Sequence, residues 1–222
     1  MIIWKANYFA KRKLKKFKNN YLNLYDEDIK DEINERLLNG FTNNNDVINQ
    51  IYCYLNIIKD EINPYKEFIK IIKKHFNINC NILEVGSGYI PILAKYLEND
   101  AKVTMVDPKI IFKNYAKGTI KNESFTLNTN LEQYNLIIGY NPCEATESMI
   151  RNTITNQKDF AIATCGCCYL PLNYPNRTKK EWHKYLIRIA NELGNNEYNI
   201  IIEFFSPSFH INNPIIIGKR KK

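Results

Sequence analysis

The chain has 222 residues, of which 45% are hydrophobic and 24% are charged, so it is long enough to bury a substantial core. It contains no apolar run approaching the roughly 18 residues of a membrane-spanning helix, and its first residues lack the basic and apolar segments of a secretion signal. Its six cysteines lack the regular spacing of a disulfide-rich secreted domain. The composition therefore favours a soluble, cytoplasmic globular protein.

The formal net charge of +8 is concentrated in two segments, Lys11–Lys18 and Lys219–Lys222. Such segments favour a polyanion such as RNA, because binding releases the counterions of the phosphates. Phe17, Tyr21 and Tyr25 could add stacking on bases. The whole chain is rich in Lys, Asn, Ile and Tyr, however, and this bias also produces lysine runs without selection for nucleic acid. RNA and a small molecule both stay open as partners, and no membrane contact is expected.

Residues 1–77 are expected to form a helical extension before the main domain. Apolar residues between Asp46 and Ile58 recur with the 3.6-residue period of an amphipathic helix, which Pro64 ends or bends. A second helix around Phe68–Phe76 leads into the first strand. We expect these helices to cap one face of a sheet.

Residues 78–222 alternate short apolar runs with helical stretches, a rhythm typical of βαβ units and a mostly parallel sheet. Thr178 and Glu181 predict a capping box at the start of the last helix, and Gly194 is expected to close that helix. The predicted strands cover residues 81–85, 102–106, 124–127, 135–139, 160–164, 199–205 and 214–218. The predicted helices include residues 90–97, 146–156 and 179–193.

The connection between the last two strands, residues 206–213, is too short for a crossover helix. These strands must therefore pair antiparallel. The expected architecture is a three-layer Rossmann-like α/β fold whose seven-stranded sheet is mostly parallel and has an antiparallel last strand.

A candidate nucleotide site lies at the end of the first strand, which reads Glu84-Val85-Gly86-Ser87-Gly88. Glycines at a strand-to-helix turn let the backbone approach a ligand closely. The next strand ends in Asp107-Pro108, where a carboxylate can accept both hydroxyls of a ribose. The predicted cofactor-binding residues are Glu84, Gly86, Ser87, Gly88, Asp107 and Pro108.

A dinucleotide fingerprint needs a third glycine beside the pyrophosphate, and Pro91 stands at that position. S-adenosylmethionine has no pyrophosphate and does not require that glycine. With its terminal hairpin and its Glu84-x-Gly86-x-Gly88 turn, the chain resembles the class I (Rossmann-like) S-adenosylmethionine-dependent methyltransferases. This resemblance implies S-adenosyl-L-methionine as cofactor, with Glu84 contacting its methionine part.

The fourth strand is followed by Asn141-Pro142-Cys143-Glu144, where the resembled family keeps its catalytic loop. Amino-group methyltransferases often carry Asn-Pro-Pro-aromatic there, and this motif holds the target nitrogen toward the methyl group. The chain keeps Asn141 and Pro142 but has Cys143 and Glu144 at the next positions. We predict Asn141, Pro142 and Cys143 as catalytic residues, with a turn that merely ends the strand as the alternative.

Cys165, Cys167 and Cys168 follow the fifth strand and allow three interpretations. They are buried thiols, zinc ligands together with Cys143, or nucleophiles. Separated Cys-x-x-Cys pairs are absent from the sequence, so no metal is predicted. The Pro-Cys at 142–143 and the Thr-Cys at 164–165 look like the pair in RNA 5-methylcytosine methyltransferases, but an acidic residue is missing before the proline.

Histidines offer little to this chemistry, and His183 on the last helix is expected at the surface. The sequence therefore predicts an S-adenosylmethionine-dependent methyltransferase whose acceptor is RNA or a small-molecule amine. The alternatives are a non-catalytic cofactor- or RNA-binding module with this fold, and an NAD-dependent oxidoreductase.

Overall fold

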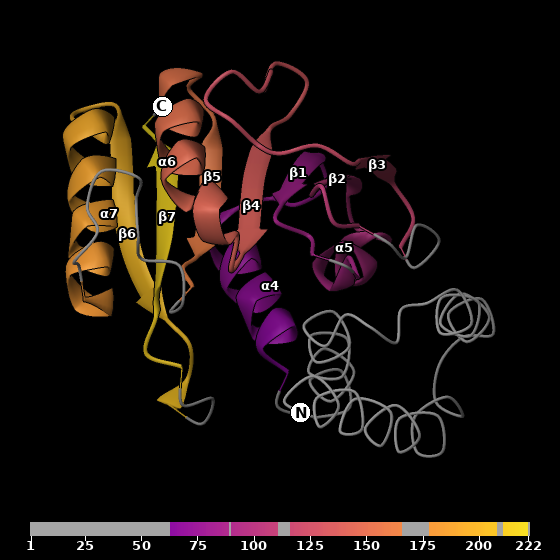
Figure 1. Cartoon of the computed structure of the whole chain (residues 1–222), viewed down its shortest axis with the longest axis horizontal. Coiled ribbons are helices and arrows are strands. Elements are labelled where there is room, and N and C mark those ends of the chain that lie inside the picture. Colours follow the sequence, from indigo (N-terminus) through magenta and orange to yellow (C-terminus); the bar gives the residue numbers. More distant parts are fainter. Residues whose placement is uncertain (1–62, 89, 111–115, 166–177, 208–210, 222) are drawn as a thin grey trace, which may run out of the picture.

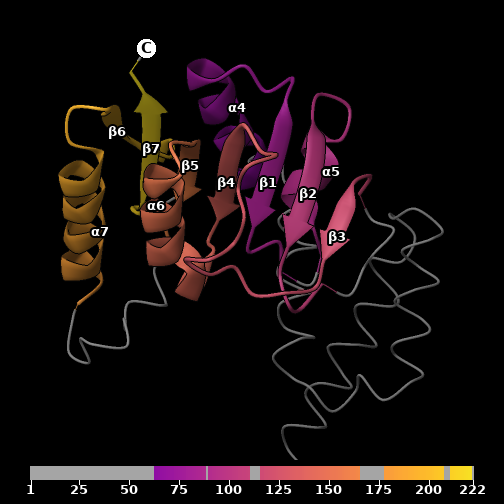
Figure 2. The ribbon, with the colours of Figure 1, turned by 90° about the horizontal axis from the view of Figure 1, so that it is seen from above.

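The computed structural model describes residues 63–88, 90–110, 116–165, 178–207 and 211–221. Helices cover both faces of a central sheet, α4 and α5 on one face and α6 and α7 on the other (Figures 1 and 2). The strands are β1 (Asn81–Val85), β2 (Lys102–Val106), β3 (Thr119–Lys121), β4 (Leu136–Tyr140), β5 (Asp159–Ala163), β6 (Tyr198–Phe204) and β7 (Pro214–Arg220). The helices are α4 (Pro64–His75), α5 (Ile92–Leu97), η3 (Cys143–Ala145, a 3₁₀ turn), α6 (Thr146–Thr155) and α7 (Lys179–Gly194).

The seven strands form one sheet in the order β3-β2-β1-β4-β5-β7-β6. Strands β1 to β5 pair parallel with one another, whereas β7 is antiparallel to both β5 and β6. This sheet confirms the predicted fold class, including the antiparallel last strand. Because the carboxyl ends of parallel strands share one edge, the loops after β1, β2, β4 and β5 meet at that edge, and β7 ends at the opposite one.

The prediction of a strand at residues 124–127 was wrong, because the third strand is Thr119–Lys121. β3 pairs with β2 over only three residues at the sheet edge, and its side chains are exposed or half-buried, so it carries no apolar signal. In the segment 124–127, Phe125 is buried in the core while Leu127 is 54% exposed. Thr129 donates its amide to the Thr126 carbonyl at 3.2 Å, which makes this segment a turn.

Helix α7 confirms the capping box, because Thr178 Oγ1 accepts from the Glu181 amide and the Glu181 carboxylate accepts from the Thr178 amide. Gly194, however, is the last residue of the helix. The residue with the positive φ that ends the helix is the next one, Asn195, at 38°. A Cβ at Gly194 would lie 3.0 Å from the Cβ of Tyr198. This glycine therefore serves close packing against the next strand.

Pro64 begins α4, where its missing amide proton costs no hydrogen bond. The buried side chain of Asn63 caps the helix by accepting from the amides of Tyr65 and Lys66. Phe68 and Ile72 are fully buried in the core cluster that also contains β1 and α5. This helix therefore caps one face of the sheet, as the sequence predicted, while the helix predicted over residues 46–58 lies outside the described residues.

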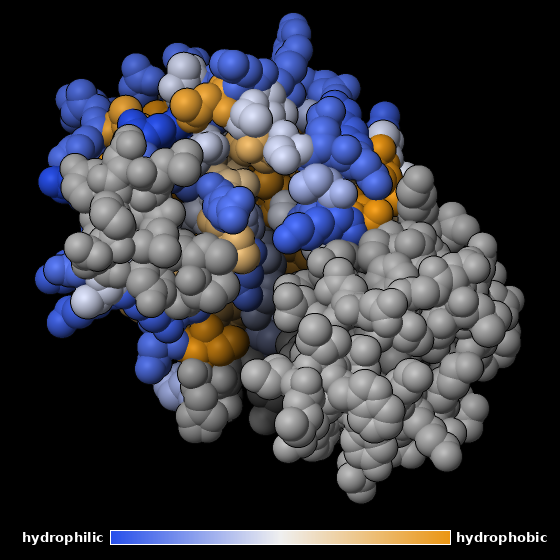
Figure 3. Space-filling view, in the orientation of Figure 1, coloured by the Kyte–Doolittle hydropathy of each residue, from blue (hydrophilic) through white to orange (hydrophobic). Residues whose placement is uncertain are grey.

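The described surface shown in Figure 3 is mainly hydrophilic, with scattered apolar residues between the polar ones. The large apolar side chains that are exposed in the described ranges are Leu127, Leu193 and Phe204. Among the helices of the described ranges, none combines the length and the apolar character that crossing a bilayer requires.

Strands β5 and β7 pack so closely that Gly218 has no room for a side chain, because a Cβ there would overlap the ring of the fully buried Phe160. We predict that Gly218→Ala lowers the free energy of unfolding by about 1–3 kcal/mol, the usual cost of overpacking. Urea unfolding measures this change. The double variant Gly218→Ala/Phe160→Leu should recover part of the loss, and a wild-type midpoint for Gly218→Ala would contradict the packing described here.

Candidate functional site

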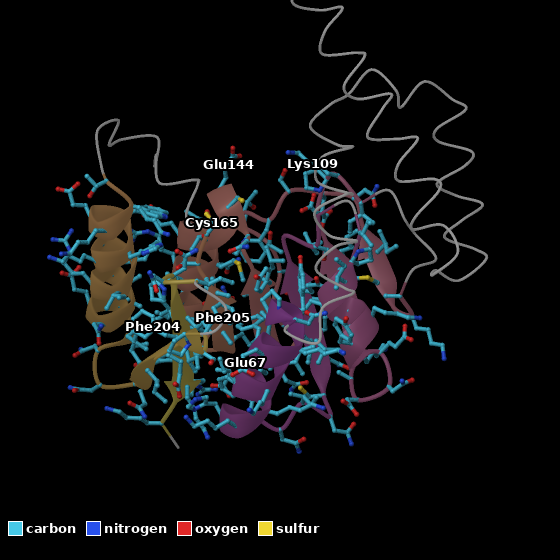
Figure 4. All side chains as sticks on the ribbon, turned by 90° about the horizontal axis from the view of Figure 1, so that it is seen from below. Glu67, Lys109, Glu144, Cys165, Phe204 and Phe205 are labelled. Atoms are coloured by element: carbon cyan, nitrogen blue, oxygen red, sulfur yellow. The ribbon has the colours of Figure 1, made fainter. Side chains whose placement is uncertain are left out.

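The predicted site residues come together at the carboxyl edge of the sheet, at the end of β1 and in the loops after β1, β2 and β4. In Figure 4, Lys109, Glu144 and Cys165, which follow β2, β4 and β5, lie along this edge. The order β2-β1-β4-β5 makes these strands neighbours. Residues far apart in the sequence therefore share one surface.

The loop after β1 is shaped by two glycines in the left-handed region, Gly86 with φ 76° and Gly88 with φ 67°. The Gly86 amide donates to the Val106 carbonyl at 2.9 Å, which ties the loop to the end of β2. A Cβ at Gly86 would lie 2.7 Å from Cα of Pro142. Glycine is thus required here for its φ and also for the contact between the loops after β1 and β4.

Asp107 is held by backbone amides on both sides. Its Oδ2 accepts from the Gly88 amide at 3.0 Å, and its Oδ1 accepts from the Lys109 amide at 2.7 Å. The residue is half-buried, and each carboxylate oxygen retains lone pairs for further donors. The Asp107 carboxylate is therefore held in one orientation and can still accept from further donors, such as hydroxyl groups, and the exposed Pro108 lies beside it.

Glu84 is a buried carboxyl group, 3% exposed, at the end of β1. The pKa of Glu84 is raised to about 8, mainly by burial and to a smaller extent by the nearby Asp107, against the lowering effect of the Ala94 amide and the Ser87 hydroxyl. Among the described residues, no hydrogen bond of normal geometry reaches Glu84 Oε2 or the buried Ser87 Oγ. An acidic group buried without a full set of partners is unfavourable, and a cationic ligand would supply the missing donor.

The loop after β4 turns sharply, with Asn141 at φ 53° and Cys143 at φ 49°. Asparagine tolerates this left-handed conformation better than most residues. The Asn141 amide donates to the Ala163 carbonyl at 2.8 Å, while its side chain is exposed and Pro142 is buried against Gly86. The exposed Asn141 therefore directly precedes Pro142, the residue that contacts the glycine loop.

The cysteines differ in exposure, because Cys143 is half-buried and Cys165 is 2% exposed. Cys167 and Cys168 lie outside the described residues. Within the described ranges, no group of three or more His, Cys, Asp or Glu side chains is placed to hold a metal ion.

The prediction that His183 lies at the surface was wrong, because this residue is 8% exposed. Its Nε2 lies 3.1 Å from the Cys165 carbonyl oxygen, and burial lowers the pKa of His183. The neutral ring therefore donates from Nε2 to that carbonyl and ties α7 to the end of β5. Trp182 and Leu186 lie on the same buried face of α7, and their apolar side chains are the sequence signal that could have predicted a buried His183.

Sequence reasoning also missed a group of aromatic side chains next to the loop after β4. The ring of Tyr140, the last residue of β4, lies 4.3 Å from that of Tyr65, 5.9 Å from that of Phe68 and 6.0 Å from that of Phe205. These residues come from α4, β4 and the segment after β6, so only the tertiary structure brings them together.

The basic tail lies away from this surface. Lys219 Nζ donates to the His75 carbonyl at 3.0 Å, and the Arg220 amide donates to Asp159 at 2.8 Å. Both residues belong to the end of β7, which pairs with the start of β5 at the opposite edge from Asn141. Lys11–Lys18 and Lys222 lie outside the described residues.

The sequence matches no known protein family, and no curated protein is similar to it in sequence. Among solved structures, a TehB-like SAM-dependent methyltransferase from Corynebacterium glutamicum is similar at 13% identity, over 79% of this chain and 98% of that chain, with a TM-score of 0.49. A methyltransferase from Pyrococcus furiosus is similar at 14% identity, over 73% of this chain and 86% of that chain, also with a TM-score of 0.49.

A further similar structure is the 1,6-didemethyltoxoflavin-N1-methyltransferase of Burkholderia thailandensis with bound 1,6-didemethyltoxoflavin and S-adenosylhomocysteine. It is 14% identical over 80% of this chain and 86% of that chain, with a TM-score of 0.49. At identities this low and TM-scores below 0.5, these similarities establish neither the fold nor the function of this chain, and the fold follows from the strand order. With its sheet order β3-β2-β1-β4-β5-β7-β6 and its antiparallel β7, the chain has the class I methyltransferase fold.

Proposed function

We propose that the protein is a cytoplasmic S-adenosyl-L-methionine-dependent methyltransferase. The observation that carries this proposal is the buried Glu84 carboxyl, whose Oε2 lacks a hydrogen-bond partner among the described residues. It lies at the end of the strand that leads into Gly86 and Gly88, and Asp107 accepts from the Gly88 amide. The cofactor carries an ammonium group and a ribose diol, which match the two carboxylates.

The described residues fit this cofactor in three respects. Its ammonium group would donate to Glu84 and favour the ionised carboxylate. The two left-handed glycines leave the backbone open to close approach, and Asp107 is held for the ribose hydroxyls. When bound, the cofactor supplies a methyl group on a sulfonium, which is transferred by in-line displacement.

On the acceptor side, Asn141 presents an exposed carboxamide beside the buried Pro142. This group would hold an acceptor amine, on RNA or on a small molecule, with its nitrogen lone pair facing the methyl group. The nitrogen would form the new bond to the methyl carbon as the carbon–sulfur bond breaks, and the methylated amine would then lose a proton to solvent. Alignment and exclusion of water are what the protein must provide.

The first prediction concerns which cofactor binds. S-adenosylhomocysteine and S-adenosylmethionine should each raise the midpoint of thermal unfolding, because a ligand of the native state stabilises it by about 2.7 kcal/mol at 100 times its Kd. Asp107→Ala should remove this shift, whereas Asp100→Ala, which removes an exposed partner of Lys73, should keep it. A shift with NAD or NADP alone would favour an oxidoreductase and overturn the proposal.

The second prediction follows from the raised pKa of Glu84, about 8 in the folded chain and ~4.3 in the unfolded one. Between these values the folded chain holds a proton that the unfolded chain has lost, so this group lowers stability as pH rises from about 5 to 8. Glu84→Gln removes this titration. As pH rises from about 5 to 8, the free energy of unfolding of Glu84→Gln should therefore increase relative to that of wild type, by roughly several kcal/mol.

The same pair of proteins tests the role of Glu84 in binding. Wild-type affinity for S-adenosylhomocysteine should increase up to about pH 8, because the cation requires ionised Glu84. In Glu84→Gln the affinity should be about ten- to a hundredfold weaker and independent of this titration. Urea unfolding and titration calorimetry at several pH values supply both readouts, and parallel pH profiles for the two proteins would contradict the assignment.

The third prediction separates a catalytic Asn141 from a residue that only shapes a turn. Asn141→Gly keeps the left-handed backbone but removes the carboxamide, so it should retain affinity for S-adenosylhomocysteine and lose methyl transfer by about a hundredfold. Methyl transfer from labelled cofactor to RNA and small-molecule fractions measures the loss, with the exposed neighbour Glu144→Gln as control. Full activity in Asn141→Gly would show that Asn141 only shapes the turn and has no catalytic role. If wild type binds the cofactor but transfers no methyl group, the protein is a non-catalytic module.

A further inference from the structure

The two edge strands of the sheet differ in how well they are protected against pairing with another chain. At one edge, β3 is only three residues long and ends in Lys121, and both properties discourage pairing. At the other edge, β6 is seven residues long and contains three consecutive isoleucines and no proline (Figure 2). β6 is therefore the edge of this sheet that can accept a further strand.

The hydrogen bonds of β6 show which of its backbone groups face outward. The Lys221 amide donates to the Glu197 carbonyl at 2.8 Å, and this pair continues the register of β6 with β7. Because bonded and non-bonded pairs alternate along an antiparallel ladder, Ile201 also bonds to β7, whereas Ile200 and Ile202 point their amides and carbonyls away from it. Among the described residues, these outward groups have no hydrogen-bond partner.

The single charged residue of β6, Glu203, does not protect this edge. Its Oε1 lies 2.6 Å from Nζ of Lys74 and 3.0 Å from Nε2 of His75, both in the last turn of α4. The negative charge is thus compensated within the chain, on the α4 side of the sheet. A free charge that would repel a second strand is therefore missing from β6.

A second copy of β6 fits this edge in one register over the full length of the strand. When Ile201 lies opposite Ile201 of the second copy, all seven residues pair and the outward backbone groups of the two strands meet. Glu203 then lies opposite Asn199, so no like charges face each other. A pair centred on Ile200 would instead place Glu203 opposite Glu197, which is unfavourable.

Exposed apolar side chains flank the same edge. Phe204 is 56% exposed, and Leu193, in the last turn of α7, is 41% exposed. Phe204 faces the α7 side of the sheet, because side chains alternate along a strand and Ile202 packs in the core cluster on that side. In the register centred on Ile201, Phe204 lies opposite Tyr198 of the second copy, which packs against the end of α7. Pairing would therefore cover apolar surface of both copies.

We propose that β6 is the interface of a symmetric dimer, in which the β6 strands of two copies of this chain pair antiparallel about Ile201. The outward groups of Ile200 in each copy then bond to those of Ile202 in the other, and the two sheets become one. The candidate functional site lies in the loops after β1, β2 and β4, away from this edge. The dimer is therefore independent of the proposed function.

Sedimentation velocity of the full chain at a series of concentrations tests the interface. Wild type should form a dimer of twice the mass of one chain. Ile202→Pro should weaken dimerisation about tenfold or more, because proline removes an outward amide from each copy while the ladder with β7 keeps its bonds. Ile202→Lys should also weaken it, whereas Leu127→Lys, at a side chain that is 54% exposed between β3 and β4, should not.

Cysteine cross-linking tests the register. Two copies of residue 201 would form a non-hydrogen-bonded pair whose Cα atoms lie about 4.5 Å apart, which suits a disulfide. Mild oxidation should therefore link Ile201→Cys into covalent dimers well above the wild-type background. Ile200→Cys, which would lie opposite Ile202, should stay at that background.

Cooperative thermal unfolding shows which variants are folded, and Ile202→Lys decides if Ile202→Pro is not. A monomeric wild type would overturn the interface, and so would a dimer that the folded variants at residue 202 leave unchanged. A dimer in which Ile201→Cys does not link, or links no better than Ile200→Cys, would overturn the register.

Discussion

The contact between Gly86 and Pro142 is the constraint on which the site depends. It joins the turn after β1 to the turn after β4, and a Cβ at Gly86 would lie 2.7 Å from Cα of Pro142. The contact follows from the parallel pairing of β1 with β4, which brings the two carboxyl ends together. Methyl transfer needs donor and acceptor in van der Waals contact and in line. In the proposed function, their distance would be set by this packed backbone contact and not by flexible side chains.

The two carboxylates of the site are held in opposite ways, and this difference matches two kinds of ligand group. Asp107 is half-buried, accepts from two backbone amides and is suited to neutral hydroxyls. Glu84 is buried with an unpartnered Oε2 in the described part of the chain, and burial raises its pKa to about 8. Glu84 therefore lies in an environment that is unfavourable for its ionised form, and a bound cation, as in the proposed function, would relieve it.

Sequence reasoning succeeded where the signal is local. The buried strands β1 and β2, the capping box of Thr178 and Glu181, and the short terminal hairpin all depend on neighbouring residues, and the structure confirms them. It failed at β3, whose three residues are not buried. It also missed His183 and the group around Tyr140, because burial of a polar residue and the meeting of rings from three elements depend on tertiary packing. The contact of Gly86 with Pro142 was invisible for the same reason.

The decisive experiment is a crystal structure of the complex with S-adenosylhomocysteine. We expect the amino group of the ligand within hydrogen-bond distance of Glu84 Oε2 and the ribose hydroxyls on the Asp107 carboxylate. We also expect the sulfur to face the Asn141–Pro142 turn. A ligand bound at another edge of the sheet, or bound here with Glu84 Oε2 still lacking a donor, would contradict this assignment.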